Sequence, residues 1–288
     1  MKLGIFSHCT IDEIKITEGL YERPGGPVCY CGLAARKLGF DVEIVTKFGS
    51  DFVFLDELQN NKIKVDNTPS QKPTTRFRLE IIDSDRTLWI QNICEEIEYK
   101  KIDADGILIS PVFNEISKST LGKIKNDSEL VALDPQGFLR KSTDKKISLE
   151  RTELDLSGIT VLKSDPSEVF GLTGLEGIEG ALALHKKIKH VLYTNKRNVS
   201  LFHNNKQYSI RLPNMDIYDT SGVGDIFTAT FCCTLLKERD VLWALSFAGG
   251  AAQAALESKE IGLDKIPPRG ATEANASYFY NTIKFTDV

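Results

Sequence analysis

The stretch DTSGVGD, residues 219–225, is the part of the sequence that decides the fold and suggests a chemistry. Gly222 and Gly224 let the backbone turn tightly and bring its N–H groups close to a ligand, because no Cβ stands in the way. The apolar run that follows, IFTATFCCTLL, predicts a helix whose unpaired first-turn amides form an anion site. Asp225 would stand beside that site, where its carboxylate can accept the proton of an attacking hydroxyl. This combination is typical of phosphoryl transfer.

A simple turn is the competing interpretation, because Gly-x-Gly-Asp is common in turns and Asp is a good N-cap residue. The full heptapeptide, however, resembles the signature Asp-Thr-x-Gly-x-Gly-Asp of the ribokinase-like carbohydrate kinases, also called the PfkB family. The resemblance implies that Asp225 is the catalytic base and that Gly222, Val223 and Gly224 form the anion hole. It also implies that Asp219 lies near a monovalent-cation site.

Size and composition are those of an ordinary globular protein. The chain has 288 residues, 41% hydrophobic and 26% charged, which is enough for one large α/β domain or two small ones. A net charge of -4 argues against affinity based on nucleic-acid phosphates. No segment approaches the ~20 apolar residues that span a bilayer. We therefore expect a cytoplasmic protein without nucleic-acid or membrane partners.

Short apolar runs predict buried strands over residues 3–7, 42–48, 106–110, 130–134, 159–163 and 190–194. Helical stretches separate most of them, and the first, residues 28–38, stops at Gly39. Strands rich in Val, Ile and Leu that alternate with helices predict a mostly parallel sheet covered on both faces. Ligands of such sheets bind at the carboxyl ends of the strands.

A different pattern over residues 74–93 predicts a hairpin that turns at 83–85. Polar and apolar residues alternate strictly from 76 to 81, which is typical of a sheet with one solvated face. In ribokinase-like proteins the equivalent strands close over the sugar. We therefore expect a three-layer α/β/α core and a small β-sheet that serves as a lid or as a homodimer contact, with residues 1–9, 26–71 and 97–288 in the core and residues 10–25 and 72–96 in the lid.

The segment RPGGPVCYCGLAARKLG, residues 23–39, resembles the N-terminal Gly-Gly signature of the same family. The resemblance implies that the amides of Gly25 and Gly26 hold the acceptor hydroxyls together with Asp12. Ribokinases proper have an Asn where this chain has Tyr30. That exchange replaces a two-sided amide with a ring and one hydroxyl, which argues against ribose as the substrate.

Three further segments resemble family elements, and the first two lie within residues 133–174. LDPQGFLR, residues 133–140, makes Gln136 and Arg140 candidates for reaching the acceptor, with a solvated surface position as the alternative for Arg140. LKSDPSEVFGLTG, residues 162–174, resembles the Asn-x-x-Glu element that organises Mg²⁺ and phosphate through water, with Asp165 in place of Asn and Glu168 matched. The same two residues also fit a helix capping box, and both roles can hold at once.

The donor side of the resemblance rests on Lys163 and Asp165 in that segment and on Thr194, which opens TNKRNVS. The family usually has Thr-x-Gly-x-x-Gly at this point, and here Lys196 and Val199 replace both glycines. ATP is the default donor and another nucleotide is the alternative. Lys196 or Arg197 would supply charge to the donor phosphates, or form a solvated surface turn.

Taken over the chain to about residue 257, the resemblance implies an ATP-dependent kinase that phosphorylates a hydroxyl of a small sugar or polyol. Mg²⁺ and a monovalent cation such as K⁺ are the implied cofactors. RPGGPVCY and LDPQGFLR most resemble the archaeal myo-inositol kinase branch. A nucleoside kinase of the same family and a non-catalytic sugar-binding protein are the alternatives. A nicotinamide-dependent oxidoreductase is disfavoured, because its glycine loop after the first strand is absent.

Overall fold

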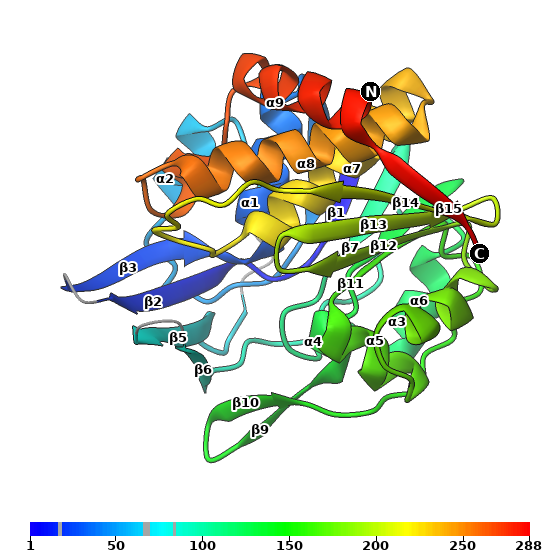
Figure 1. Ribbon diagram of the computed structural model, residues 1–288. Coiled ribbons are helices and arrows are strands. Elements are labelled where there is room, and N and C mark those ends of the chain that lie inside the picture. The colour runs from blue at the N-terminus through cyan, green and yellow to red at the C-terminus, as the bar shows by residue number, and fades with distance from the viewer. Residues whose placement is uncertain (17–18, 66–69, 83–84) are drawn as a thin grey trace.

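A computed structural model describes residues 1–16, 19–65, 70–82 and 85–288 (Figure 1). Its main sheet has the order β15-β14-β13-β12-β11-β8-β7-β1-β4 among these residues. The strands from β4 to β12 run parallel, and β13, β14 and β15 add antiparallel to one edge. The bounds are β1 Lys2–Phe6, β4 Asp41–Val45, β7 Gly106–Ile109, β8 Leu130–Leu133, β11 Val161–Ser164, β12 His190–Asn195, β13 Asn198–His203, β14 Lys206–Arg211 and β15 Lys284–Asp287.

Helices cover both faces of this sheet, as Figure 1 shows. One layer contains α1 Gly26–Lys37, α2 Leu55–Asn60, α7 Val223–Glu238, α8 Val241–Glu257 and α9 Arg269–Thr282, with the 3₁₀ turn η1 Gly262–Lys265 between the last two. The other layer contains α3 Lys118–Ile124, α5 Pro166–Thr173 and α6 Gly177–His185, and the short helix α4 Gln136–Leu139 follows β8.

The strands are apolar on both sides because each side faces a helix layer. In β7, Leu108 packs in the core that contains α1, α7 and α8, whereas Ile107 and Ile109 pack in the core that contains α3, α5 and α6. Successive side chains point to opposite faces of a strand, so a continuous apolar run serves both cores. The predicted three-layer α/β/α fold with a mostly parallel sheet is confirmed.

A second sheet of order β3-β2-β5-β6-β10-β9 lies beside the carboxyl ends of the central strands (Figure 1). Its bounds are β2 Thr10–Ile16, β3 Gly19–Gly25, β5 Thr75–Ile82, β6 Asp85–Asn92, β9 Arg140–Thr143 and β10 Lys146–Leu149. The first four strands fall within the predicted lid, although the predicted turn at 83–84 lies outside the described residues. We refer to the six strands together as the lid sheet.

The hairpin of β9 and β10 corrects the prediction, which assigned residues 140–149 to the core. Lys146 of β10 pairs with Trp89 of β6, so the hairpin extends the lid sheet. No local pattern predicts this hairpin, because KSTDKK has no apolar alternation. Its turn places Asp144 and Lys145 in the left-handed region, at φ 49° and 67°. Such a turn usually carries Gly or Asn.

Buried hydrogen bonds tie the lid sheet to the core at His8, which follows β1. Its Nδ1 lies 2.9 Å from Oγ1 of Thr75, the first residue of β5, and its Nε2 lies 2.7 Å from the carbonyl oxygen of Glu95. Burial lowers the pKa of His8, so the ring is neutral and Nε2 carries the proton donated to that carbonyl. These hydrogen bonds hold two segments of the chain, at Thr75 where β5 begins and at Glu95 after β6, close to the carboxyl end of β1.

Candidate active site

A cavity of about 600 Å³ lies between the carboxyl ends of the central strands and the lid sheet. The predicted site residues that line it are Asp12, Gly26, Tyr30, Gln136, Lys163, Asp165, Glu168, Gly222, Gly224 and Asp225. They come from segments more than 200 residues apart in the sequence. The fold therefore brings the predicted acceptor and donor segments to one cavity.

Four predicted residues stand outside this lining, within the described part of the chain: Gly25, Thr194, Asp219 and Val223. Val223 is the first residue of α7, between two residues that do line the cavity. Gly25 is shielded by Asp12, since a Cβ at this position would lie 2.1 Å from Oδ2 of that carboxylate. The positions of Thr194 and Asp219 are described below.

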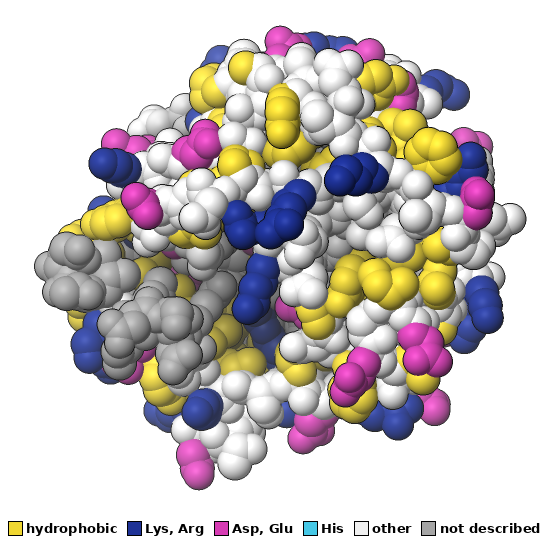
Figure 2. Space-filling view, in the orientation of Figure 1, with side chains coloured by type: hydrophobic (Ala, Val, Ile, Leu, Met, Phe, Trp, Pro, Cys, Tyr) yellow, Lys and Arg dark blue, Asp and Glu magenta, His cyan; other side chains and the backbone are white. Residues whose placement is uncertain are grey.

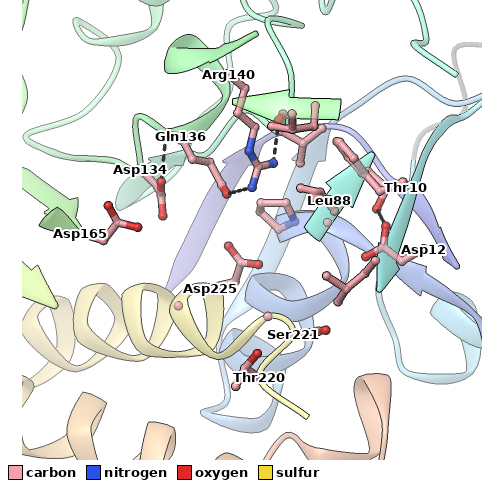
Figure 3. A pocket seen from close by; sticks show the side chains of 18 of the residues that line it. Thr10, Asp12, Leu88, Asp134, Gln136, Arg140, Asp165, Thr220, Ser221 and Asp225 are labelled. Carbon is pink, nitrogen blue, oxygen red and sulfur yellow. Dashed lines mark hydrogen bonds between the residues drawn. The ribbon is translucent and has the colours of Figure 1, made fainter. Parts of the chain in front are cut away.

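The start of α7 has the conformation that an anion site requires. Gly222 precedes the helix at φ 68°, in the left-handed region that glycine adopts without strain. No side chain caps the helix, so its first-turn amides are not satisfied by the protein's own cap. Asp225 lies in this first turn, and Figure 3 shows its carboxylate pointing into the space between Gln136 and Asp12.

The surroundings of Asp225 bring the pKa of its carboxyl group close to neutral pH. Burial and the neighbouring carboxylate of Asp134 raise its pKa to about 7, against the opposing effects of Lys163 and Arg140. A general base works best when its pKa lies near the working pH. Asp225 meets this condition, because it accepts a proton near pH 7 and releases it again easily.

A buried charge cluster lies next to Asp225 at the ends of β8 and β11. Nζ of Lys163 lies 3.0 Å from Oδ2 of Asp134 and 3.6 Å from Oε2 of Glu168. Burial alone would lower the pKa of Lys163, but the two carboxylates outweigh it and raise that pKa. The ammonium also faces Gly224, where a Cβ would lie 3.5 Å from Nζ. A permanent positive charge therefore stands beside the start of α7.

Asp165 and Glu168 form the predicted capping box of α5. Oδ1 of Asp165 accepts the backbone N–H of Glu168 at 2.8 Å, and Oε2 of Glu168 accepts the N–H of Asp165 at 2.7 Å. Burial, followed by the negative charges of Asp134 and Asp165, raises the pKa of Glu168 to about 8 against the effect of Lys163. The box holds both carboxyl groups at the cavity wall.

These carboxylates bear on the implied Mg²⁺. No group of three or more His, Cys, Asp or Glu side chains that could enclose a metal occurs among the described residues. The oxygen ligands present suit a hard cation that keeps several of its waters. The geometry is thus compatible with Mg²⁺ held by Asp165 and Glu168 through water, together with donor phosphate oxygens.

The acceptor side of the cavity carries Asp12 on β2. Its Oδ1 accepts a hydrogen bond of 2.7 Å from Oγ1 of Thr10, and both residues line the cavity. Gly26 has φ 79°, and a Cβ there would lie 2.7 Å from the carbonyl oxygen of His8. Close approach of neighbouring atoms therefore favours glycine at both positions, and backbone conformation requires it at Gly26 as well.

Gln136 and Arg140 reach the same space from α4 and the start of β9 (Figure 3). Nη2 of Arg140 donates to Oε1 of Gln136 at 2.7 Å, and Nη1 donates to the carbonyl oxygen of Val112 at 2.8 Å. The guanidinium also lies 5.6 Å from the ring centroid of Phe77. The alternative of a solvated surface arginine is wrong, because these contacts hold Arg140 against the cavity.

Thr194 lies near the end of β12, and Lys196 and Arg197 form the turn to β13. Tyr193 pairs with Ser164 of β11, which places Thr194 beside Asp165 at the carboxyl edge of the sheet. Lys196 is exposed and adopts φ 54°, in the left-handed region that favours glycine. Arg197 is partly buried and lines a different hollow.

Asp219, which precedes the glycine loop, pairs with a buried lysine. Its Oδ2 lies 2.7 Å from Nζ of Lys265 in η1, and neither side chain is more than 4% exposed. Burial would raise the pKa of Asp219, but Lys265 and the N–H of Ser221 outweigh it and lower that pKa. Asp219 therefore carries its negative charge behind the loop.

Sequence reasoning missed two functional candidates, Asp134 and Lys265. Asp134 is the first residue after β8 and is 2% exposed. Its signal was present, since an Asp at the carboxyl end of a buried parallel strand points to the ligand side of the sheet. Lys265 had no such signal, because the contact joins residues 46 positions apart.

No helix in the described part of the chain is long and apolar enough to cross a membrane. No curated protein sequence matches the chain. Residues 130–267 match the model of the pfkB family carbohydrate kinases. This region contains β8, the charge cluster and the start of α7.

Solved structures with the same fold include a pyrophosphate-dependent kinase of the ribokinase family in a sulfate complex, with a TM-score of 0.82 and 18% identity over 94% of this chain and 99% of that one. A pyrophosphate-dependent kinase of that family with a pyrophosphate analog and myo-inositol has a TM-score of 0.81 and 19% identity over 94% and 99%. Ribokinase from Arabidopsis thaliana with ribose and ATP has a TM-score of 0.77 and 19% identity over 95% and 98%. The chain therefore has the ribokinase-like fold, and its residues 130–267 match the pfkB family of carbohydrate kinases.

Proposed function

We propose that the protein transfers the terminal phosphoryl group of ATP to a hydroxyl of a small cyclic polyol or sugar. The observation that carries this proposal is the position of Asp225, a carboxylate with a pKa of about 7 at the uncapped start of α7. It faces a cavity that also holds Asp12 and Lys163. One cavity thus contains a base, an anion site and groups suited to hydroxyls.

The acceptor would lie between Asp12 and the apolar residues of the lid sheet. A carboxylate accepts hydrogen bonds from two hydroxyls, and the Gln136 amide and Arg140 guanidinium offer donors on the opposite side. Apolar side chains from the lid sheet and its surroundings line the same space and would cover the C–H face of a ring: Phe77, Leu79, Leu88, Val112 and Ile147. This mixture suits a compact polyhydroxylated ring such as an inositol.

In the transfer step, Asp225 would take the proton of the attacking hydroxyl as the hydroxyl oxygen bonds to the terminal phosphorus, while the bond from that phosphorus to the bridging oxygen breaks and ADP leaves. The amides at the start of α7 would hold the phosphoryl oxygens, and the helix dipole would stabilise their charge. Lys163, 3.0 Å from Asp134, would pair with the donor phosphates. Mg²⁺, when bound near Asp165 and Glu168, would neutralise further phosphate charge.

Pyrophosphate is a second candidate for the donor. The donor-side residues that line the cavity are polar or glycine, including Lys163, Asp165 and Thr220, whereas the large apolar lining residues belong to the acceptor side. An adenine base normally binds against apolar or aromatic surface. Two solved structures with this fold are of a pyrophosphate-dependent kinase in the ribokinase family. Figure 2 also shows Lys and Arg side chains gathered near the middle of the face displayed, where they would attract a small anionic donor.

A direct test incubates the protein and Mg²⁺ with ATP or pyrophosphate and a panel of polyols, sugars, sugar acids and nucleosides, and follows phosphate-ester formation by ³¹P NMR. We expect an ester with a polyol or sugar. Ester formation with nucleosides alone would establish the nucleoside kinase alternative. Acceptor binding by calorimetry without an ester from either donor would support the non-catalytic sugar-binding alternative and contradict the proposal.

A further inference from the structure

Lys265 is a fully buried cation directly behind the glycine loop. Its side chain is 0% exposed, and Nζ lies 2.7 Å from Oδ2 and 3.2 Å from the backbone oxygen of Asp219. A buried ammonium is costly unless it is paired and hydrogen-bonded, so this arrangement holds both groups firmly in place. Asp219 and Lys265 do not line the cavity among the described residues, so the ion pair lies behind the loop.

The pair is connected to the start of α7 by two routes. Oδ1 of Asp219 accepts the N–H of Ser221 at 2.7 Å, and Ser221 directly precedes Gly222. Nζ of Lys265 also lies 5.8 Å from the ring centroid of Tyr30, against which Gly222 packs. A change at Lys265 would therefore affect the start of α7 in two ways. It would act on the loop backbone through Asp219 and Ser221, and on Gly222 through the ring of Tyr30.

The sequence resemblance implies a monovalent-cation site near Asp219, and in the structure two oxygens of Asp219 instead contact the ammonium group of Lys265. An ammonium group and a monovalent ion carry the same charge, and a second cation on these oxygens would be repelled by the first. We propose that Lys265 is the built-in cation of the glycine loop, a positioning residue that makes phosphoryl transfer independent of added monovalent cations. The inference rests on the proposed kinase function for its activity readout.

The test compares the wild type with Lys265→Met and Lys265→Ala, each with and without K⁺ or NH₄⁺ at constant ionic strength set by tetramethylammonium chloride. We expect wild-type turnover to be unchanged by K⁺. Lys265→Met should lose turnover by roughly 10²-fold and regain it with K⁺ or NH₄⁺. Lys265→Ala removes three methylene groups and the ammonium group, and n-propylammonium has the same non-hydrogen atoms. Added n-propylammonium should therefore fill the space and restore activity.

Lys125→Met is the matched control. Lys125 is also buried and bonds a carboxylate and a backbone oxygen of one residue, Asp155, at 2.5 and 3.0 Å, but it lies outside the cavity lining. This variant should lose stability, because Asp155 loses its partner, and its turnover should not respond to cations. A wild type that requires K⁺, or a folded Lys265→Met that keeps full turnover without any cation, would overturn the inference.

Thermal stability gives a readout that does not depend on kinase activity. K⁺ should raise the Tm of Lys265→Met and leave the Tm values of the wild type and Lys125→Met unchanged. If no acceptor is phosphorylated, the proposed function fails, and the Tm comparison still decides whether position 265 replaces a cation. If K⁺ raised the Tm of the wild type as much as the Tm of Lys265→Met, the inference would be contradicted. This comparison holds even if Lys265→Met is too unstable for the activity assay.

Discussion

The ring of Tyr30 lies so close to Gly222 that a Cβ on this glycine would come within 2.3 Å of the ring carbons. Tyr30 is 2% exposed, and its ring supports the loop that opens α7. It also lines the cavity, so the predicted contact with substrate remains a prediction. The Asn-to-Tyr departure from the ribokinase pattern thus has a structural consequence at the transfer site.

Gly222→Ala should destabilise the protein and abolish transfer. The left-handed backbone costs an alanine about 1 kcal/mol, and the overlap with Tyr30 costs roughly 1–3 kcal/mol more. Gly122→Ala is the matched control, because a Cβ there meets open space within α3 and should leave stability equal or higher. Urea unfolding and turnover measure both effects. Equal stability of the two variants would show that the loop can move away from Tyr30.

Glu168→Gln should separate the metal role of this residue from its capping role. The amide oxygen can still accept the N–H of Asp165, so the Tm should stay close to that of the wild type. The Mg²⁺ concentration for half-maximal activity should rise, because Gln cannot release a proton to supply the negative charge that Glu168 can offer to Mg²⁺. Glu168→Ala should additionally lose about 1 kcal/mol of stability. An unchanged Mg²⁺ requirement in Glu168→Gln would leave Glu168 with the capping role alone.

Asp12→Asn should weaken acceptor binding more than it slows transfer. The amide oxygen retains the hydrogen bond from Thr10 but loses the charge that strengthens bonds to substrate hydroxyls. We expect KM for the acceptor to rise by roughly 10-fold to 100-fold, with a smaller change in kcat. Glu43→Gln on β4, which breaks a surface pair with Lys2, is the control and should change neither constant. An unaltered KM in Asp12→Asn would remove Asp12 from the acceptor site.

The pH dependence should report the raised pKa of Asp225. The base must be deprotonated to act, so kcat/KM should rise with pH and level off above an apparent pKa near 7. Because the folded-state pKa is raised, the native state binds more protons, and this carboxyl reduces stability as pH rises from about 4 to 7. Asp225→Asn should therefore have a higher Tm than the wild type at pH 8, with the gap closing near pH 4. An equal Tm at both pH values would show that this carboxylate is well solvated.

The sequence predicted the fold well wherever the signal was local. The run ITVLK, which contains Val161–Ser164 up to its last residue, is largely apolar, and Gly26 and Gly222 adopt a left-handed backbone that few other residues can satisfy. These local signals were enough to predict the two glycine segments, one on each side of the cavity. The hairpin of β9 and β10 was missed because its polar strands depend on pairing with β6, which no local pattern encodes.

Features of the site that depend on distant partners could not be predicted. The ion pair of Asp219 and Lys265 and the anchoring of Arg140 by Val112 arise only when the chain has folded. An isolated Lys or Arg in a sequence is most often solvated, which was the alternative considered for Arg140. The hydrogen bonds of Arg140 to Val112 and Gln136 show that the folded protein holds this side chain in place, so it is not simply solvated.

The role of Asp225 as the base is tested by the transfer rate of Asp225→Asn under single-turnover conditions, with the best donor and acceptor of the wild type and with acceptor affinity measured by calorimetry. We expect acceptor affinity to stay within a few-fold of the wild type and the transfer rate to fall by roughly 10³-fold or more. A variant that phosphorylates the acceptor at the wild-type rate would show that Asp225 is not the base.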